Sequence, residues 1–166
     1  MFVLGIDPGL SRTGYGVVEA AGTSVRAVAA GVIHTAPEGD IASRLHELHA
    51  DLEGVIAQYA PDEVAIEEVF VNRNLQTAMA VGRASGVAIL AAAGSGLPVF
   101  EYTPSAVKMA VAGYGDATKD QVQTMVARRL GLSGAPSPAD AADALAVALC
   151  HLQSAGLRRA VEGAGR

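Results

Sequence analysis

The sequence contains very little cysteine, no long hydrophobic run and only modest charge. Its single cysteine, Cys150, cannot form a disulfide within the chain, and its apolar neighbours Leu149 and Leu152 predict a small buried side chain in a reducing compartment. The longest near-continuous apolar stretch, residues 86–94, is too short to span a bilayer, and no basic segment precedes the apolar residues after Met1. We therefore expect a cytoplasmic protein that is neither secreted nor bound to a membrane.

The chain also lacks the basic excess typical of nucleic-acid-binding proteins, because its formal net charge is −5. Residues 40–68 contain eight acidic side chains and one basic side chain, which leaves 11 basic and 9 acidic side chains in the rest of the sequence. One acidic face therefore coexists with a mildly basic remainder. Because the local field steers a polyanion more than the net charge does, this distribution disfavours DNA binding without excluding it.

The length of 166 residues and the hydrophobic content of 51% predict one domain with a substantial core. Apolar spacing and turn residues predict strands at residues 2–7, 14–19, 25–34, 63–67 and 98–102, and helices at residues 41–59, 75–93, 104–111, 119–130 and 138–152. Asp40 and Thr118 are placed to cap the helices that follow them. The order predicts an α/β fold with a mixed five-stranded sheet flanked by helices, in which the first strand is central. The domain is expected at residues 1–155, followed by a basic flexible tail at residues 156–166.

Four acidic side chains occupy positions from which a metal site could be built. Asp7 and Glu67 each end an apolar strand, and open α/β sheets place their functional sites beyond such strand ends. Asp140 and Asp143 lie three residues apart at the start of the last expected helix, so both project from one face of its first two turns. Like charges brought close together are costly unless a proton or a cation joins them. The pattern predicts a divalent-metal site suited to phosphodiester chemistry.

Each of these acids also has a structural interpretation. Asp7 could simply begin a turn, and because strand side chains alternate, only one of Glu67 and Glu68 can share its face of the sheet. A solvated strand end explains Glu67 as well as a ligand role does. Asp140 has the spacing of a capping box and suits the helix dipole. Asp143 has the weakest structural explanation, because its neighbours make that turn of the helix apolar.

Basic and aromatic side chains near the acids are candidates for contacts with DNA. Lys108 and Lys119 are the only lysines, and each is expected near the start of a helix whose loops could return to the strand ends. A lysine beside several carboxylates could position a scissile phosphate, although most lysines are solvated surface residues. Phe70 and Arg73 follow Glu67 in a loop, where a ring beside an arginine could stack on an unpaired base. Phe70 could equally be a core residue.

Two familiar kinds of site are missing from the sequence. The residues before Lys119 lack the Gly-Lys-Ser/Thr order of a phosphate-binding P-loop, which argues against nucleotide hydrolysis by that route. The four histidines lack the spacing of metal ligands, and we assign them no role.

Small residues recur on one face of the helix expected at residues 75–93, namely Ala78, Gly82, Ser85 and Gly86. They would let a neighbour approach closely. The neighbour could be the chain's own sheet or the same helix of a second copy in a two-fold dimer.

Several short segments, taken together, resemble the RuvC family of Holliday junction resolvases. They are GIDPG at residues 5–9, TGYG at 13–16, AIEEVF at 65–70, YTP at 102–104, VK at 107–108 and ADAADALA at 139–146. The resemblance runs from about residue 2 to residue 152, in order and at family-like spacing. It implies a ribonuclease H-like fold, a homodimer, and resolution of four-way DNA junctions by paired symmetric Mg²⁺-dependent nicks that leave 5′-phosphate and 3′-hydroxyl ends, in recombination and DNA repair.

The resemblance also implies roles for the four acids. Asp7, Glu67, Asp140 and Asp143 match the catalytic, metal-binding acids, which would hold two Mg²⁺ ions per active site, with Mn²⁺ able to substitute. Glu67 rather than Glu68 matches the family glutamate. Some relatives carry histidine at the position of Asp140.

The same resemblance implies DNA contacts and partners. Lys108 and Lys119 match basic positions near the scissile strand, Phe70 matches an aromatic residue that acts at the junction centre, and Arg73 matches a basic position in the same loop. The family also implies cooperation with the RuvA–RuvB branch-migration complex.

Two other functions stay open at this point. Asp7 and Gly9, followed by Thr13 and Gly14, also resemble the phosphate-binding turn of actin-like ATPases, although those enzymes need a second such domain. A non-catalytic junction-binding relative would keep the fold but is expected to lose acids, and all four are present. ATP binding without junction binding would support the first alternative, and junction binding without nicking would support the second.

Overall fold

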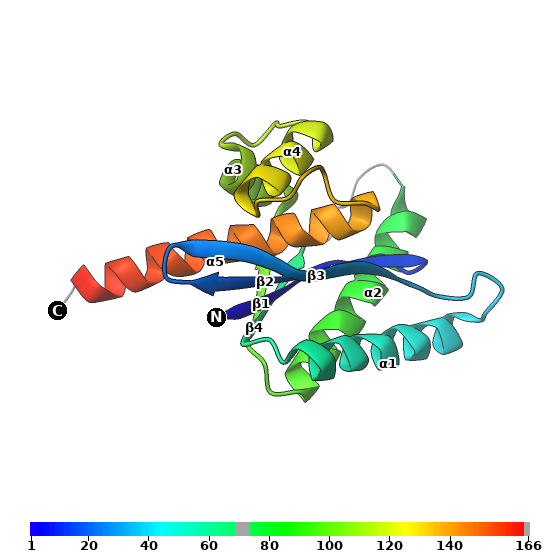
Figure 1. Ribbon diagram of the computed structural model, residues 1–166. Helices are drawn as coiled ribbons and strands as arrows, with labels where there is room; N and C mark the ends of the chain where they lie inside the picture. The colour runs from blue at the N-terminus through cyan, green and yellow to red at the C-terminus, as the bar shows by residue number, and fades with distance from the viewer. Residues whose placement is uncertain (69–73, 165–166) are drawn as a thin grey trace.

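A mixed five-stranded sheet forms the centre of the molecule (Figure 1). The computed structural model describes residues 1–68 and 74–164, with side chains described through residue 156. The strands are β1 (Phe2–Asp7), β2 (Arg12–Ala21), β3 (Ser24–His34), β4 (Glu63–Glu67) and β5 (Val99–Tyr102). Their order in the sheet is β3-β2-β1-β4-β5, with β1, β2 and β3 antiparallel and with β4 and β5 parallel to β1. The expected mixed sheet and its central first strand are confirmed.

Helices cover both faces of the sheet (Figure 1). They are α1 (Ile41–Tyr59), α2 (Leu75–Gly94), α3 (Pro104–Ala112), α4 (Lys119–Arg129) and α5 (Ala139–Ala164). One face carries α1 and α2, and the other carries α5, against whose outer side α3 and α4 pack. The expected caps are confirmed, because the Asp40 carboxylate accepts a hydrogen bond from the Ser43 amide and Thr118 forms a capping box with Gln121.

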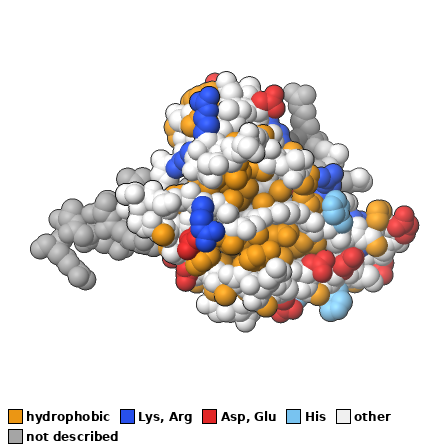
Figure 2. Space-filling model, in the orientation of Figure 1, with side chains coloured by type: hydrophobic (Ala, Val, Ile, Leu, Met, Phe, Trp, Pro, Cys, Tyr) orange, Lys and Arg blue, Asp and Glu red, His pale blue; other side chains and the backbone are white. Residues whose placement is uncertain are grey.

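The alternation of side chains along the central strands separates two hydrophobic clusters. Leu4, Ile6 and Ile66 are buried against α1 and α2, whereas Val3 and Ala65 are buried against α5. Acidic side chains also divide by face. Figure 2 shows them gathered over α1, while hydrophobic side chains follow the β3 edge of the sheet. The acidic side chains of α1 therefore lie across the sheet from α5, whereas Glu63 and Glu67 of the same acidic segment face α5.

Helix α5 lies directly on β1 and β2 because glycine faces it there. A β-carbon on Gly5 would lie 2.1 Å from the carbonyl oxygen of Ala144, and one on Gly14 would lie 2.0 Å from the carbonyl oxygen of Asp140. Real β-carbons do not approach other atoms this closely, so any larger residue would push the helix away. These two glycines set the depth at which the N-terminal end of α5 sits.

The end of α5 differs from its sequence prediction. We expected the helix to end near Leu152, but it continues to Ala164, so residues 156–164 are helical where a tail was expected. The prediction gave too much weight to Gly156, because an isolated glycine costs only about 1 kcal/mol within a helix. At 26 residues, α5 is about 39 Å long, and its C-terminal end projects beyond the sheet (Figure 1).

Helix α2 is long and apolar enough, by length and composition alone, to cross a membrane. Core helices of soluble proteins pass the same test, so this is weak evidence. Ala84, Ala88, Ala91 and Ala92 of α2 are buried in the hydrophobic cluster that also contains side chains of α1 and of the sheet. This face of α2 is therefore covered by the protein itself.

Candidate active site

Asp7 and Glu67 lie side by side at one edge of the sheet. They end the neighbouring parallel strands β1 and β4, whose register pairs Ile6 with Ile66 one residue earlier. Since Ile6 and Ile66 are buried on the face of α1 and α2, Asp7 and Glu67 face α5. Glu68 is exposed, so the structure resolves which of the two glutamates shares the face of Asp7.

The start of α5 brings Asp140 and Asp143 to the same edge. Gly14 is the register partner of Asp7 on β2 and lies directly under the backbone of Asp140. Asp140 and Asp143 are both half-buried, as are Asp7 and Glu67. The four acids expected from the sequence therefore come together, although they come from three separate elements.

The ionisation of Asp7 reflects this crowding. The pKa of Asp7 is raised from 3.8 to about 7, mainly because its carboxyl group is buried and also because Glu67, Asp143 and Asp140 repel its negative charge. The nearby ammonium of Lys119 opposes the rise. Near neutral pH, Asp7 therefore carries its proton for a substantial part of the time, and a cation bound here would favour its release.

Two basic side chains pair with the helical acids. The Nζ atom of Lys119 lies 2.6 Å from Oδ2 of Asp143, and Nη2 of Arg12 lies 2.7 Å from Oδ2 of Asp140. The hydrogen bond to Asp143 is the main reason that the pKa of Lys119 is raised. Both basic side chains are more than half exposed, so each pair contributes little to stability. Arg12 and Lys119 thus neutralise Asp140 and Asp143, and a more strongly bound cation could displace these two basic side chains.

The two lysines expected near the strand ends line the same cavity, which has a volume of about 220 Å³. Its lining residues are Glu67, Pro104, Val107, Lys108, Lys119, Val122, Asp143 and Ala146. Lys119 and Lys108 oppose the rise in the pKa of Glu67 that burial and Asp143 cause. Positive charge and an apolar wall thus border the acids on the side of α3 and α4.

The donor set suits a hard divalent cation, because carboxylate oxygens are the ligands that Mg²⁺ and Mn²⁺ prefer. Within the described part of the chain, no three acidic, histidine or cysteine side chains are drawn together tightly enough to ligate one ion. Asp140 and Asp143 instead form ion pairs with Arg12 and Lys119, respectively. The residues fit the ion by the chemistry of their carboxylates and by their shared location at one edge of the sheet.

A family model for the crossover junction endodeoxyribonuclease RuvC matches residues 3–151 of the sequence. The chain belongs to the RuvC family. The match includes Asp7, Glu67, Asp140 and Asp143, and it confirms the resemblance that the short sequence segments indicated.

Individual RuvC proteins are similar to the chain over nearly its whole length. The crossover junction endodeoxyribonuclease RuvC of Pelotomaculum thermopropionicum is 53% identical over 151 residues, which cover 91% of this chain and 92% of that protein. RuvC of Moorella thermoacetica is 51% identical over 167 residues and covers 100% of both chains.

Solved structures agree with this assignment. Thermus thermophilus RuvC in complex with a Holliday junction substrate superimposes with a TM-score of 0.88 at 42% identity, over 93% of this chain and 94% of that chain. The yeast mitochondrial Holliday junction resolvase, at 14% identity and a TM-score of 0.62 over 89% of this chain and 77% of that one, shares the fold. The expected ribonuclease H-like fold is confirmed.

Sequence analysis of this RuvC chain missed two residues and named two that the structure does not describe. Arg12 was missed, although a basic residue at the start of β2, just beyond the turn after Asp7, is a usable signal. His151 was assigned no role, yet it is completely buried among polar partners. Phe70 and Arg73 lie outside the described residues.

Proposed function

We propose that this protein is a structure-selective endonuclease that resolves four-way DNA junctions by paired symmetric nicks, in homologous recombination and DNA repair. Membership of the RuvC family and similarity to a relative solved with a Holliday junction substrate support this function. The observation that carries the proposal is the convergence of Asp7, Glu67, Asp140 and Asp143 at one edge of the sheet, beside two lysines.

The proposed reaction is hydrolysis of one phosphodiester bond in each of two strands. A water oxygen bonds to phosphorus while the bond from phosphorus to the 3′ oxygen breaks, which leaves a 5′ phosphate and a 3′ hydroxyl. Negative charge grows on the phosphoryl oxygens and on the leaving oxygen. A site for this reaction must therefore present fixed positive charge and keep a water molecule in line with the leaving group.

We assign the four acids to hold two divalent ions, Mg²⁺ or Mn²⁺ in its place. When bound, such ions supply a water nucleophile at neutral pH and Lewis acidity at the leaving oxygen. Asp7 interacts electrostatically with Glu67 of β4 and with both acids of α5, so we assign its carboxylate as the shared ligand. Its pKa of about 7 means that it must release a proton as the ions bind.

The basic side chains have a separate task in this proposal. Lys119 is held by Asp143 in the structure, and once a cation takes over that carboxylate its ammonium is free to donate to a phosphate oxygen. Lys108 lines the same cavity and would contact the neighbouring phosphate. Phe70 and Arg73 keep the junction contacts that the family resemblance implies. The acidic surface over α1 lies across the sheet and does not oppose the approach of DNA to this edge.

Paired nicks need two sites, which a two-fold dimer supplies. Helix α2 offers a surface for it, because Leu75, Met79 and Leu90 are exposed and added β-carbons on Gly82 and Gly86 would meet nothing within 4 Å. Ser85, which was expected on the same small-residue face, is buried instead. We propose a homodimer through α2 that acts in the cytoplasm, together with the RuvA–RuvB complex that the family resemblance implies.

A nicking assay tests the activity. A synthetic four-way junction and a linear duplex of the same sequence are each incubated with Mg²⁺ and, separately, with EDTA. We expect paired nicks in the junction alone, only with Mg²⁺, and products that a ligase can seal. Junction binding without any nicking would favour a non-catalytic relative, and equal cutting of the linear duplex would contradict junction selectivity.

A further inference from the structure

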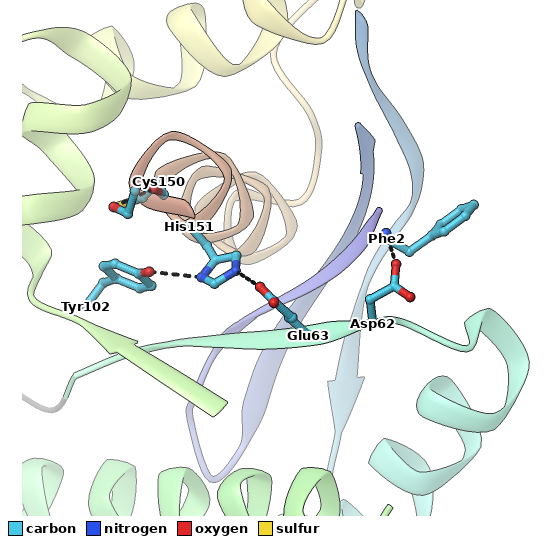
Figure 3. A network of polar contacts seen from close by, with 7 residues as sticks. Phe2, Asp62, Glu63, Tyr102, Cys150 and His151 are labelled. Atoms are coloured by element: carbon cyan, nitrogen blue, oxygen red, sulfur yellow. Dashed lines mark hydrogen bonds and ion pairs between the residues drawn. The ribbon is translucent and has the colours of Figure 1, made fainter. Parts of the chain in front are cut away.

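A buried polar network lies outside the acidic site and ties α5 to two strands (Figure 3). His151 of α5 is completely buried. Its Nδ1 atom lies 2.9 Å from the hydroxyl oxygen of Tyr102 at the end of β5, and its Nε2 atom contacts the carboxylate of Glu63 at the start of β4. The ring of Phe100 packs against the imidazole, with 4.7 Å between the ring centroids. Both ring nitrogens of this buried side chain therefore have hydrogen-bond partners, as buried polar groups generally do.

For a neutral His151, its partners define a direction for each hydrogen bond. An ionised carboxylate can only accept, so Nε2–H of His151 donates to Glu63. In the neutral imidazole, Nδ1 is then the acceptor, and the hydroxyl of Tyr102 donates to it. Hydrogen bonds are directional, so these two hydrogen bonds fix the side-chain rotamer of His151. They also fix the position of α5 over the sheet.

The network holds the same strands that carry the acidic site. Glu63 and Glu67 are the first and last residues of β4, and both face α5. Tyr102 is the register partner of Glu67, and its carbonyl oxygen accepts a hydrogen bond of 2.8 Å from the amide of Glu68. A shift of His151 would therefore move both ends of the strand that presents Glu67, relative to α5.

The rest of the α5 contact with the sheet is apolar. Ala141, Ala144 and Ala148 are small, whereas Leu145 and Leu149 are among the largest fully buried side chains. Dispersion contacts between such side chains are individually non-directional, so they define the rotation of the helix less specifically than a hydrogen bond does. Gly5 and Gly14 set the depth of the helix near its start. His151, 11 residues or about 16 Å beyond Asp140, adds a directional contact to this apolar packing.

We propose that His151 is a positioning residue, which, through Tyr102 and Glu63, sets the placement of the α5 acids Asp140 and Asp143 against Glu67 of β4. It touches neither substrate nor cation. This inference rests on the proposed metal-dependent function. It goes beyond that function by assigning the geometry of the ligand set to a buried hydrogen-bonded network about three turns farther along the same helix.

The test measures binding of Mn²⁺ without DNA, by the electron paramagnetic resonance signal of the free ion, together with the thermal unfolding midpoint. The variants are His151→Phe, which fills the space without hydrogen bonds, Glu63→Ala, and Glu63→Gln, whose amide oxygen still accepts from Nε2–H. The matched control is Leu52→Ala, which opens a cavity in the other hydrophobic cluster, under α1. All measurements are made below the unfolding range of every variant.

We expect His151→Phe and Glu63→Ala to weaken Mn²⁺ binding about 10- to 100-fold, as is typical when the partners of a ligand shell are lost. Glu63→Gln should bind Mn²⁺ nearly as well as the parent protein, and Leu52→Ala should lower the unfolding midpoint without changing the affinity. If His151→Phe does not fold, Tyr102→Phe replaces it, with a smaller loss expected because one hydrogen bond remains.

Three results would overturn the inference. Unchanged affinity in His151→Phe and Glu63→Ala would show that the network only stabilises the fold. An equal loss in Leu52→Ala would show that any destabilisation weakens the site. Absence of Mn²⁺ binding by the parent protein would overturn both this inference and the metal-dependent function, whereas the first two results leave that function intact.

Discussion

Gly14 of β2 lies directly beneath the carbonyl oxygen of Asp140 in α5, with only 2.0 Å available for a β-carbon. Gly14 is also the register partner of Asp7. This backbone contact therefore joins the β1–β2 pair, which carries Asp7, to α5, which carries Asp140 and Asp143. The spacing of the acids depends on how closely this helix can approach the sheet.

We first predict that Gly14→Ala displaces the start of α5 and abolishes junction cleavage. An added methyl group cannot fit beneath a backbone carbonyl, so the free energy of unfolding should fall by about 1–3 kcal/mol. Denaturant unfolding and the nicking assay measure the two effects. Gly54→Ala is the control, because Gly54 lies in α1 with open space around it. That change should retain activity and stabilise the helix by about 0.5–1 kcal/mol.

Asp7→Asn should abolish cleavage while junction binding persists, because the amide cannot serve as an anionic ligand. In EDTA at pH 8, the same change should raise the thermal unfolding midpoint, since it removes a carboxylate whose ionisation is opposed by burial and by Glu67. Gel-shift, nicking and thermal unfolding measurements separate the three effects. Cleavage at the parental rate would contradict the assignment of Asp7 as a ligand.

The stability of the metal-free protein should fall as the pH rises from about 4 to about 7. The pKa of Asp7 is raised to about 7 in the folded protein, so the folded state binds this proton more tightly than the unfolded state does. The loss should be roughly 4 kcal/mol at most, since each pH unit in this window contributes about 1.4 kcal/mol. Adding Mg²⁺ at pH 8 should restore stability, because a ligand that binds only the folded state stabilises it. Denaturant unfolding of the parent protein and of Asp7→Asn at a series of pH values measures the contribution of Asp7 to the free energy of unfolding.

Glu67→Gln and Glu68→Gln form a matched pair of neighbouring substitutions. Glu67 faces α5 and its pKa is raised by burial and by Asp143, whereas Glu68 is exposed. We expect Glu67→Gln to reduce the cleavage rate at least about 100-fold, the scale of losing an electrostatic group in a catalytic site, and Glu68→Gln to leave the rate unchanged. Single-turnover nicking measures both rates. Equal losses in the two variants would mean that the register of β4 does not select the catalytic glutamate.

Met79→Lys should convert the proposed dimer to a monomer, because it places a charge in the exposed apolar surface of α2. Met109→Lys is the control, since Met109 of α3 is exposed to a similar degree, 54% against 50% for Met79. Sedimentation velocity distinguishes the two species. The monomeric variant should lose paired nicking, and a Met79→Lys protein that still sediments as a dimer would place the interface elsewhere.

Most of the fold could be predicted because its elements carry regular apolar spacing. The helix at residues 41–59 and the strand at residues 63–67 were predicted with the bounds that the structure has. The end of α5 could not be predicted, because no strong helix-breaking residue follows Leu152 and a single glycine is tolerated.

The acidic site was predictable in part. Asp7 and Glu67 were found from strand ends, since the ends of adjacent parallel strands meet at one edge. The approach of α5 to Gly14 has no periodic signal in the sequence, and the partners of His151 lie 49 and 88 residues away along the chain. Only the three-dimensional register brings such residues together, so sequence spacing could not assign them.

The proposed ligand set is assembled from both ends of the chain, as β1 supplies its first acid and α5 its last two. A growing polypeptide on the ribosome therefore carries Asp7 long before Asp143 exists. Until α5 has emerged and packed on Gly5 and Gly14, the nascent chain lacks two of the four acids of the proposed ligand set. On this assignment, the complete site can form only after the final helix has been synthesised.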